Sequence, residues 1–227
     1  MGRPTGSRNP DFERTRDGLL KAALQRLGEP DGARASFREL AAAAGVSVAT
    51  LRHYFGSREQ LIQAVLAWYH VVGQRYLLEV ATGPLEPVAE SLARLLSRIA
   101  EGFDRGVDRV HSIGLSAGLR DPLLGPAYLT EVLDPTIESV EARLARHIAR
   151  GELRSGNVRH MAMSLVTPPL LALLHQGVLG GSRTRPLSYV AFCADHVSGF
   201  LRAYAVDPRS QGEAGPEAAS ASEPARE

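Results

Sequence analysis

Hydrophobic residues recur at intervals of three and four along most of the chain, which is the spacing that one face of an α-helix requires. The first predicted helix begins near Asp11 and has an apolar stripe of Leu19, Leu20, Ala23, Leu24 and Leu27. The sequence shows no series of short alternating segments joined by hairpin turns. The pattern therefore predicts an all-α protein of about nine helices. The longer helices after the first are expected at 58–80, 85–104, 108–118, 124–150, 157–179 and 187–205.

Residues 36–61, SFRELAAAAGVSVATLRHYFGSREQL, combine three helix starts with two abrupt stops. Ser36 and Glu39 have the S-x-x-E spacing of a capping box, in which each side chain bonds a free backbone N–H of the other residue. Gly45 suits the left-handed conformation that ends many helices, and Ser47 can cap the next helix immediately. This region is therefore predicted to hold two short helices joined by a tight turn.

A third capping pair, Ser57 and Gln60, opens the long helix that follows. Two helices joined by a short turn that contains glycine describe the helix-turn-helix unit, whose second helix can enter the major groove of DNA. A packed helical hairpin without any role in DNA binding has the same spacing. The pattern alone therefore leaves both interpretations open.

The composition is that of an ordinary soluble globular protein, with 44% apolar and 22% charged residues and a net charge of +1. Residues 1–60 carry ten basic and seven acidic residues, a mild positive bias that favours nucleic acid as a partner. The single Cys193 excludes an internal disulfide framework. No secretory signal is visible, and the most apolar stretch, 165–174, is shorter than the ~20 residues that span a bilayer. We expect a cytoplasmic protein without a membrane partner.

The seven histidines are scattered, and none belongs to a metal-binding motif such as H-E-x-x-H. The chain also lacks the G-x-S-x-G, P-loop and dinucleotide-binding glycine motifs. No metal or cofactor is therefore expected, and the chain is not expected to be an enzyme. Two alternatives stay open. One is a helical small-molecule-binding enzyme whose carboxylates meet only after folding, and the other is a protein-interaction scaffold with a degenerate helix-turn-helix.

The region 36–61 resembles the N-terminal domain of the TetR (tetracycline-repressor-like) transcriptional regulators. The resemblance rests on AGVS at 44–47, TL at 50–51, YF at 54–55 and SREQL at 57–61. It implies a regulator, most commonly a repressor, that is released from a palindromic DNA operator by a small-molecule effector. The operator, the effector and the regulated genes are not implied.

The domain organisation follows from the same resemblance. It implies a flexible basic arm at 1–10, a helix-turn-helix DNA-binding domain at 11–57 and a larger ligand-binding and dimerisation domain at 58–206. Residues 207–227 lack aromatic and branched apolar side chains. Such a segment cannot offset the entropy lost on folding, so it is expected to be disordered.

The resemblance also implies that the two short helices and the start of the long helix contact DNA. Arg38, Thr50 and Arg52 are candidates for base edges, and Val48 and Ala49 for a thymine methyl group. Arg52 stands where the family usually has tyrosine, but a guanidinium group can still bind phosphate or guanine. The candidates for phosphate contacts are Ser36, Ser47, His53, Tyr54 and Arg58.

Apolar residues of the last predicted helix recur at steps of three and four over more than two heptads. Similar TetR proteins pair their last two helices with those of a second copy, so the resemblance implies a homodimer. Packing within one chain explains the same pattern without a dimer. The candidate interface residues are Met161, Leu165, Val190, Ala194, Val197 and Leu201.

The middle helices are expected to enclose a pocket for an unknown small-molecule effector. Its candidate lining residues are Trp68, Phe103, His111, Tyr128 and His175. The two histidines are included because a polar group in an apolar wall can orient a ligand. The resemblance implies that a bound ligand shifts the helix at 108–118 and, through it, the long helix that joins the DNA-binding domain.

Overall fold

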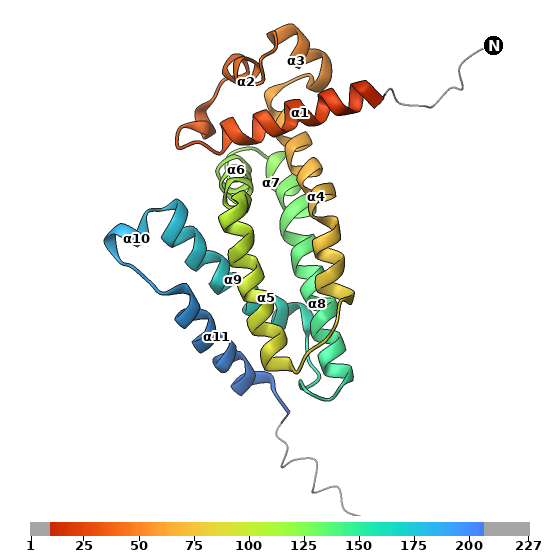
Figure 1. Cartoon of the computed structure of the whole chain (residues 1–227), viewed down its shortest axis with the longest axis vertical. Helices are drawn as coiled ribbons and strands as arrows, with labels where there is room; N and C mark the ends of the chain where they lie inside the picture. Colours follow the sequence, from red (N-terminus) through yellow and green to blue (C-terminus); the bar gives the residue numbers. More distant parts are fainter. Residues whose placement is uncertain (1–9, 207–227) are drawn as a thin grey trace, which may run out of the picture.

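The structure, a computed structural model, describes residues 10–206. Within this range it consists of helices and their connections, with one isolated β-bridge between Leu153 and Ala205. The all-α prediction is confirmed. Figure 1 shows a small group of helices at one end of a longer helical body. The predicted basic arm, apart from Pro10, and the predicted tail at 207–227 lie outside the described residues.

The first three helices form the upper end of the molecule in Figure 1, and α4 runs from them into the body. Their starts agree with the capping signals in the sequence. The bounds are α1 Pro10–Leu27, the 3₁₀ turn η1 Gly32–Arg34, α2 Phe37–Ala43, α3 Val48–Phe55 and α4 Arg58–Thr82.

The body contains the remaining helices, together with three π-helical turns, η2, η3 and η4. In chain order they are α5 Val88–Gly102, η2 Phe103–Val107, α6 Asp108–Gly118, α7 Leu124–Tyr128, η3 Leu129–Leu133, α8 Asp134–Ala149, α9 Val158–Leu173, η4 Leu174–Val178, α10 Gly181–Thr184 and α11 Tyr189–Tyr204. The predicted helix at 108–118 is found at those residues. The π-helical turns and the short α10 were not anticipated.

Gly106 marks the change of direction between α5 and α6. Its φ of +100° lies in a region that glycine adopts freely and other residues rarely do. The π-helical turn η2 leads into this kink, so α6 begins as a separate helix instead of continuing α5. The predicted break between 104 and 108 agrees with this position, although the sequence pattern does not single out Gly106.

Two hydrophobic clusters form the core. The lower cluster joins α4, α5, α8, α9 and α11. The upper cluster starts in α1–α3, continues through Leu61 and Ile62 of α4, and reaches Val110 and Ile113 of α6. Because close-packed interiors transmit displacement, this shared cluster couples α6 mechanically to the first three helices.

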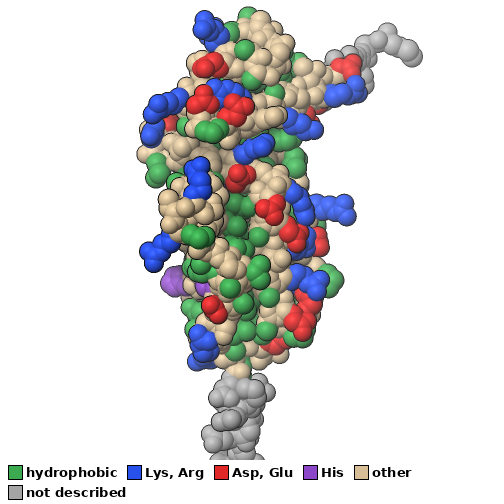
Figure 2. Space-filling view, turned by 60° about the vertical axis from the view of Figure 1, so that its left-hand side comes forward, with side chains coloured by type: hydrophobic (Ala, Val, Ile, Leu, Met, Phe, Trp, Pro, Cys, Tyr) green, Lys and Arg blue, Asp and Glu red, His purple; other side chains and the backbone are tan. Residues whose placement is uncertain are grey.

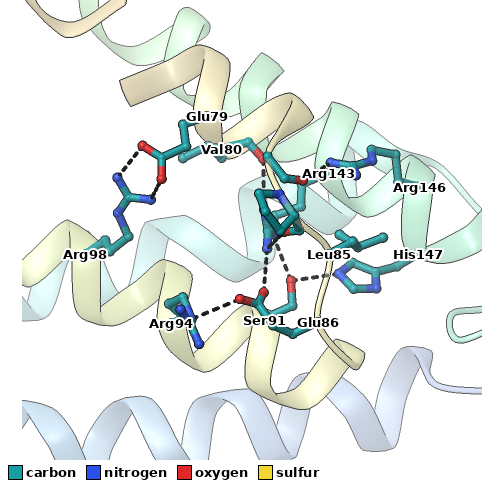
Figure 3. Close-up of polar contacts among 12 residues, drawn as sticks. Glu79, Val80, Leu85, Glu86, Ser91, Arg94, Arg98, Arg143, Arg146 and His147 are labelled. Atoms are coloured by element: carbon teal, nitrogen blue, oxygen red, sulfur yellow. Dashed lines mark hydrogen bonds and ion pairs between the residues drawn. The ribbon is translucent and has the colours of Figure 1, made fainter. Parts of the chain in front are cut away.

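A buried polar cluster fastens the lower ends of α4, α5 and α8 (Figure 3). Arg143 donates from Nε to the Ser91 hydroxyl oxygen at 2.8 Å and from Nη1 to the Val80 carbonyl oxygen at 3.1 Å. His147 places Nε2 2.8 Å from the same hydroxyl oxygen and Nδ1 2.6 Å from Oε2 of Glu152. The cluster therefore connects helices that are far apart in the sequence.

The last described residues are fastened to the loop between α8 and α9. Arg154 donates to the carbonyl oxygens of Ala203 at 2.8 Å and Ala205 at 3.1 Å. The backbone N–H of Val206 bonds the carbonyl oxygen of Glu152 at 3.2 Å. These bonds hold the end of α11 at the lower end of the body.

The helical stretch Val158–Val178 is long and apolar enough to cross a membrane by length and composition alone. The most apolar stretch was predicted at residues 165–174 only, which is shorter than the apolar helical stretch in the structure. Met161 and Leu165 on this stretch are buried in the lower core, so packing inside the protein accounts for part of its apolar character. The most apolar window is 39% buried, which leaves apolar surface exposed along α9.

Candidate nucleic-acid interface

The turn between α2 and α3 has the geometry that the capping signals predicted. The Ser36 hydroxyl oxygen accepts from the Glu39 backbone N–H at 3.3 Å, and the Glu39 carboxylate accepts from the Ser36 backbone N–H at 2.7 Å. Gly45 then adopts a φ of +68°. In this conformation the backbone reverses within a few residues, because glycine has no Cβ to clash. The reversal sets α3 across α2 instead of extending it.

Helix α3 begins at its own cap and is anchored on one side. The Ser47 hydroxyl oxygen accepts from the backbone N–H of Thr50 at 3.0 Å, and the hydroxyl oxygens of these two residues are 2.8 Å apart. Leu51 is completely buried and Phe55 is 6% exposed. These two apolar residues, four positions apart, fix the helix to the core and determine which side faces solvent.

The opposite side of α3 is open to solvent. Ala49, Arg52 and His53 are exposed, while the side chains of Val48, Thr50 and Tyr54 are half-buried. Tyr54 stacks on Phe12 of α1, with the ring centroids 4.7 Å apart. The helix therefore presents small and cationic or polar side chains outward, as a helix that enters the major groove must.

Two arginines on this surface have unengaged guanidinium groups. Arg38 on α2 and Arg52 on α3 are both exposed, and neither side chain has a hydrogen bond or ion pair recorded within residues 10–206. An unpaired guanidinium can bind a phosphate or a guanine edge without first breaking an internal contact. These two residues are therefore the best placed of the predicted base contacts.

Arg58 behaves differently from the sequence-based expectation of a simple phosphate contact. Its Nε donates to the Ala35 carbonyl oxygen at 2.8 Å, and its Nη2 donates to the Ala33 carbonyl oxygen at 2.9 Å. The guanidinium group thus connects the first turn of α4 to the segment that precedes α2. These bonds use two of the five guanidinium N–H groups, and both N–H groups of Nη1 have no described partner.

Three of the predicted effector contacts lie together at the junction of α5, α6 and α7. The rings of Phe103 and His111 stack with centroids 5.4 Å apart, and Nδ1 of His111 lies 2.6 Å from the Tyr128 hydroxyl oxygen. Burial lowers the pKa of His111 to about 4, so its ring is neutral near pH 7. Phe103 begins one π-helical turn and Tyr128 precedes another, and such turns are frequent at functional sites.

The other two predicted effector contacts lie elsewhere. Trp68 is half-buried and packs against the upper hydrophobic cluster. His175 is exposed on η4, and its Nδ1 lies 2.8 Å from the side-chain nitrogen of Gln176. The structure therefore does not bring His175 to the aromatic group, and spacing in the sequence gave no means of seeing this.

The predicted dimer residues divide between the interior and the surface. Met161, Leu165 and Val197 are buried in the lower core of the same chain, which is what the alternative of packing within one chain describes. Leu201 is half-buried. Val190, which is 81% exposed, and Ala194 remain available to a partner. Further apolar residues are exposed, namely Met163, Leu171, Leu179 and Leu187.

The buried cluster in the body arranges Ser91, His147 and Glu152 in the order of a hydrolase triad. However, Ser91 and His147 have no exposed surface, and the Ser91 hydroxyl also accepts a hydrogen bond from Arg143. A substrate carbonyl group cannot reach that hydroxyl in this arrangement. The cluster is structural, and the sequence gave no signal for it because its members are up to 61 residues apart.

Metal binding has no support from the described part of the chain. Among residues 10–206, no group of three or more histidine, cysteine, aspartate or glutamate side chains is arranged to hold a metal ion. The free Cys193 is buried. Burial raises the pKa of its thiol, which disfavours the thiolate that metal binding requires.

Comparison with known proteins agrees with this geometry. Residues 19–65 match the family described as bacterial regulatory proteins, tetR family. The HTH-type transcriptional dual regulator CecR of Shigella flexneri is 34% identical over 144 residues, which are 60% of this chain and 64% of CecR. The alignment thus spans slightly less than two thirds of that curated relative.

Solved structures share the fold over most of the chain. A protein assigned to the TetR-family transcriptional regulators of Mesorhizobium loti MAFF303099 has a TM-score of 0.72 and 20% identity, over 87% of this chain and all of that one. SmeT, solved as a triclosan complex, has a TM-score of 0.65 and 20% identity, over 93% of this chain and all of SmeT. The N-terminal match, the curated relative and the shared fold all liken this chain to the TetR family of bacterial regulatory proteins.

Proposed function

We propose that the chain is a DNA-binding transcriptional regulator. The observation that carries the proposal is the exposed face of α3, where Ala49, Arg52 and His53 face solvent while Leu51 and Phe55 anchor the helix from behind. A recognition helix needs this division between an anchored side and a free side. The similarity to CecR, a transcriptional dual regulator, supports the same function.

The contacts proposed for DNA follow from exposure. Arg52 and Arg38 read base edges or clamp phosphates, and Ala49 lets the backbone of α3 approach the groove closely. His53 and the free Nη1 of Arg58 contribute phosphate contacts. Thr50 reaches DNA only if its hydroxyl exchanges the contact with Ser47 for one with the duplex.

A homodimer is the proposed assembly. Figure 2 shows hydrophobic side chains gathered on the face where α9 and α11 lie. The exposed apolar residues of this face include Met163 at 42%, Leu171 at 60% and Val190 at 81%. An exposed apolar surface of this kind marks an interaction site more often than chance. Pairing two copies about a two-fold axis would present two α3 helices to a palindromic operator, with half-sites ~34 Å apart.

Effector binding is proposed at the aromatic group formed by Phe103, His111 and Tyr128. This group lies on and beside α6, which packs against α1, η1 and α4. The contact with α1 is close, because a Cβ at Gly28 would lie 2.6 Å from Cγ of Arg109. A ligand that moves α6 would therefore displace the DNA-binding helices. The description of SmeT as a triclosan complex supports a small molecule as the effector class.

We propose repression relieved by the effector as the mode of regulation, and a cytoplasmic location. A ligand achieves release only if it binds the DNA-free arrangement more tightly, with a coupling of ~1–3 kcal/mol. CecR is described as a dual regulator, so the experiment must distinguish activation from repression. Reporter expression from the regulated promoter is measured with and without the chain. Higher expression without the chain indicates repression, and lower expression indicates activation.

The proposal is tested by a gel shift with the DNA upstream of the chain's own gene. The wild type should retard this DNA, and the double variant with Arg38→Ala and Arg52→Ala should not. Arg75→Ala on α4 is the matched control, because that arginine is also exposed but lies in the body. Failure of the wild type to retard any operator fragment would favour an enzyme or an interaction scaffold.

A further inference from the structure

A cavity of about 210 Å³ lies between the DNA-binding helices and the body. One wall is formed by the end of α1, by η1 and by the first turn of α4, and the other by the end of α6 and the start of α7. The lining residues are Leu27, Ala33, Arg58, Glu59, Ile62, Ile113, Ser116, Ala117, Arg120, Asp121 and Leu124. The aromatic group proposed for the effector is not part of it. The cavity is therefore a separate place at which a molecule can touch both parts of the chain.

Charged groups of both signs line this cavity. Glu59 is half-buried, and its carboxylate has no described hydrogen bond or ion pair in residues 10–206. Arg120 faces it from the body side with an equally unengaged guanidinium group. Both charged groups are therefore available to a ligand without first breaking an internal contact.

Arg58 and Asp121 each have capacity to spare. Two nitrogens of Arg58 bond backbone carbonyl oxygens, but Nη1 has no described partner. Oδ1 of Asp121 accepts the backbone N–H groups of Leu123 at 2.8 Å and Leu124 at 3.2 Å, but Oδ2 has no described partner. Each wall of the cavity thus supplies one free cationic donor group and one free anionic acceptor group.

The floor of the cavity is apolar. Leu27, Ile62, Ile113 and Leu124 contribute to it, and all four are at most 4% exposed. The volume corresponds to about seven water molecules at ~30 Å³ each. This is enough for a compact molecule but not for a drug-sized ligand.

We propose that this cavity binds a free α-amino acid with an aliphatic side chain. The carboxylate of the ligand pairs with Arg120 and with Nη1 of Arg58. The ammonium group pairs with Glu59 and with Oδ2 of Asp121, and the side chain lies on the apolar floor. A simple anion or a simple cation would satisfy only half of the charged groups. The ligand would bridge the DNA-binding helices and α6, and so hold them in one relative position.

The test is direct binding, which does not depend on DNA recognition. Calorimetric titration of the full chain uses leucine, isoleucine, valine and methionine as probes. At least one of these should bind, and its analogues without the ammonium group or without the carboxylate should bind at least about tenfold more weakly. For leucine these analogues are 4-methylpentanoate and 3-methylbutylamine. Absence of binding by all four amino acids at about 10 mM overturns the proposal.

Two charge-removing variants locate the site. Glu59→Gln and Arg120→Gln each remove a charge that has no described partner, so neither should unfold the chain. Each should weaken binding of the amino acid about tenfold or more, while Arg75→Gln on the outer face of α4 leaves it unchanged. Binding that both variants leave intact, or equal binding of leucine and 4-methylpentanoate, also overturns the proposal.

Discussion

The Ser91 hydroxyl oxygen lies 2.8 Å from Nε2 of His147, although 56 residues separate the two in the chain. The same oxygen accepts a hydrogen bond from Arg143, whose Nε can only donate. Oε2 of Glu152, 2.6 Å from Nδ1 of His147, can only accept, so Nδ1 carries the ring proton. Burial lowers the pKa of His147 and favours the neutral ring, so Nε2 accepts the hydrogen of the Ser91 hydroxyl. One serine thus joins a buried histidine to a buried arginine.

Replacing this serine should destabilise the protein. Ser91→Ala leaves Nε of Arg143 and Nε2 of His147 without partners in the interior, which should lower the free energy of unfolding by about 1–3 kcal/mol. Ser97→Ala on the exposed side of the same helix is the matched control and should change it by less than about 0.5 kcal/mol. Urea denaturation measures both values, and equal effects would refute the structural role of the cluster.

The buried His111 makes stability depend on pH. Its pKa is lowered by burial to about 4, whereas in the unfolded chain it is about 6.5. Below pH 6.5 the unfolded state binds a proton that the folded state excludes, so stability falls as pH decreases from 6.5 to 4. The full loss is about 3 kcal/mol, at ~1.4 kcal/mol per unit of pKa.

The variant His111→Gln isolates this contribution, because glutamine can still bond Tyr128 but does not titrate. The difference in unfolding free energy between wild type and variant, measured in urea, should decrease by about 3 kcal/mol between pH 7.5 and pH 4. Carboxylates and His147 titrate in both proteins and cancel in the difference. A difference that is independent of pH would show that His111 is accessible to protons in the folded state.

Two glycines with equal space around them should respond to alanine in opposite ways. No heavy atom lies within 4 Å of a Cβ built at Gly45 or at Gly73. Gly45 has a φ of +68°, so Gly45→Ala should cost about 1 kcal/mol of unfolding free energy through backbone strain. Gly73 lies inside α4, where alanine is favoured by about 1 kcal/mol. Thermal melting of both variants, in which Gly45→Ala melts lower and Gly73→Ala higher than the wild type, checks the turn geometry.

DNA binding should depend strongly on salt. With about five phosphate contacts per chain, a dimer makes about ten. Its affinity should then fall by roughly 10³–10⁵ between 50 and 200 mM monovalent salt. Fluorescence anisotropy with a labelled operator measures this slope. Arg52→Ala should flatten it if that arginine contacts phosphate and should leave it unchanged if it reads a base, while a flat wild-type response would contradict the interface.

Local signals in the sequence predicted most of the fold. Ser36, Ser47 and Ser57 start helices at the expected positions because a cap is a contact between residues three apart. Gly106 and the π-helical turns were missed, since they arise where separate helices pack against each other. The apolar spacing of α9 was also recognised from the sequence. Spacing does not reveal which neighbouring helix covers the apolar face, so Met161 and Leu165, which are buried within the chain, were assigned to a dimer interface.

The candidate interface could be predicted for the same local reason. The exposed and buried sides of α3 follow from its period, and Leu51 and Phe55 define both. The carbonyl partners of Arg58 lie 23 and 25 residues earlier in the chain, and spacing gives no access to them. The same holds for Phe103, His111 and Tyr128, which were named separately and whose mutual contact appeared only in three dimensions.

The bonds between Arg154 and the end of α11 have a practical consequence. They fix the carboxyl end of the described chain at the extremity of the molecule opposite to α3 (Figure 1). A fluorophore, an affinity handle or a surface tether attached at this end would therefore start about as far from α3 as the length of the described chain allows. Immobilised or labelled versions for biosensor work can be built at that end without obstructing the duplex.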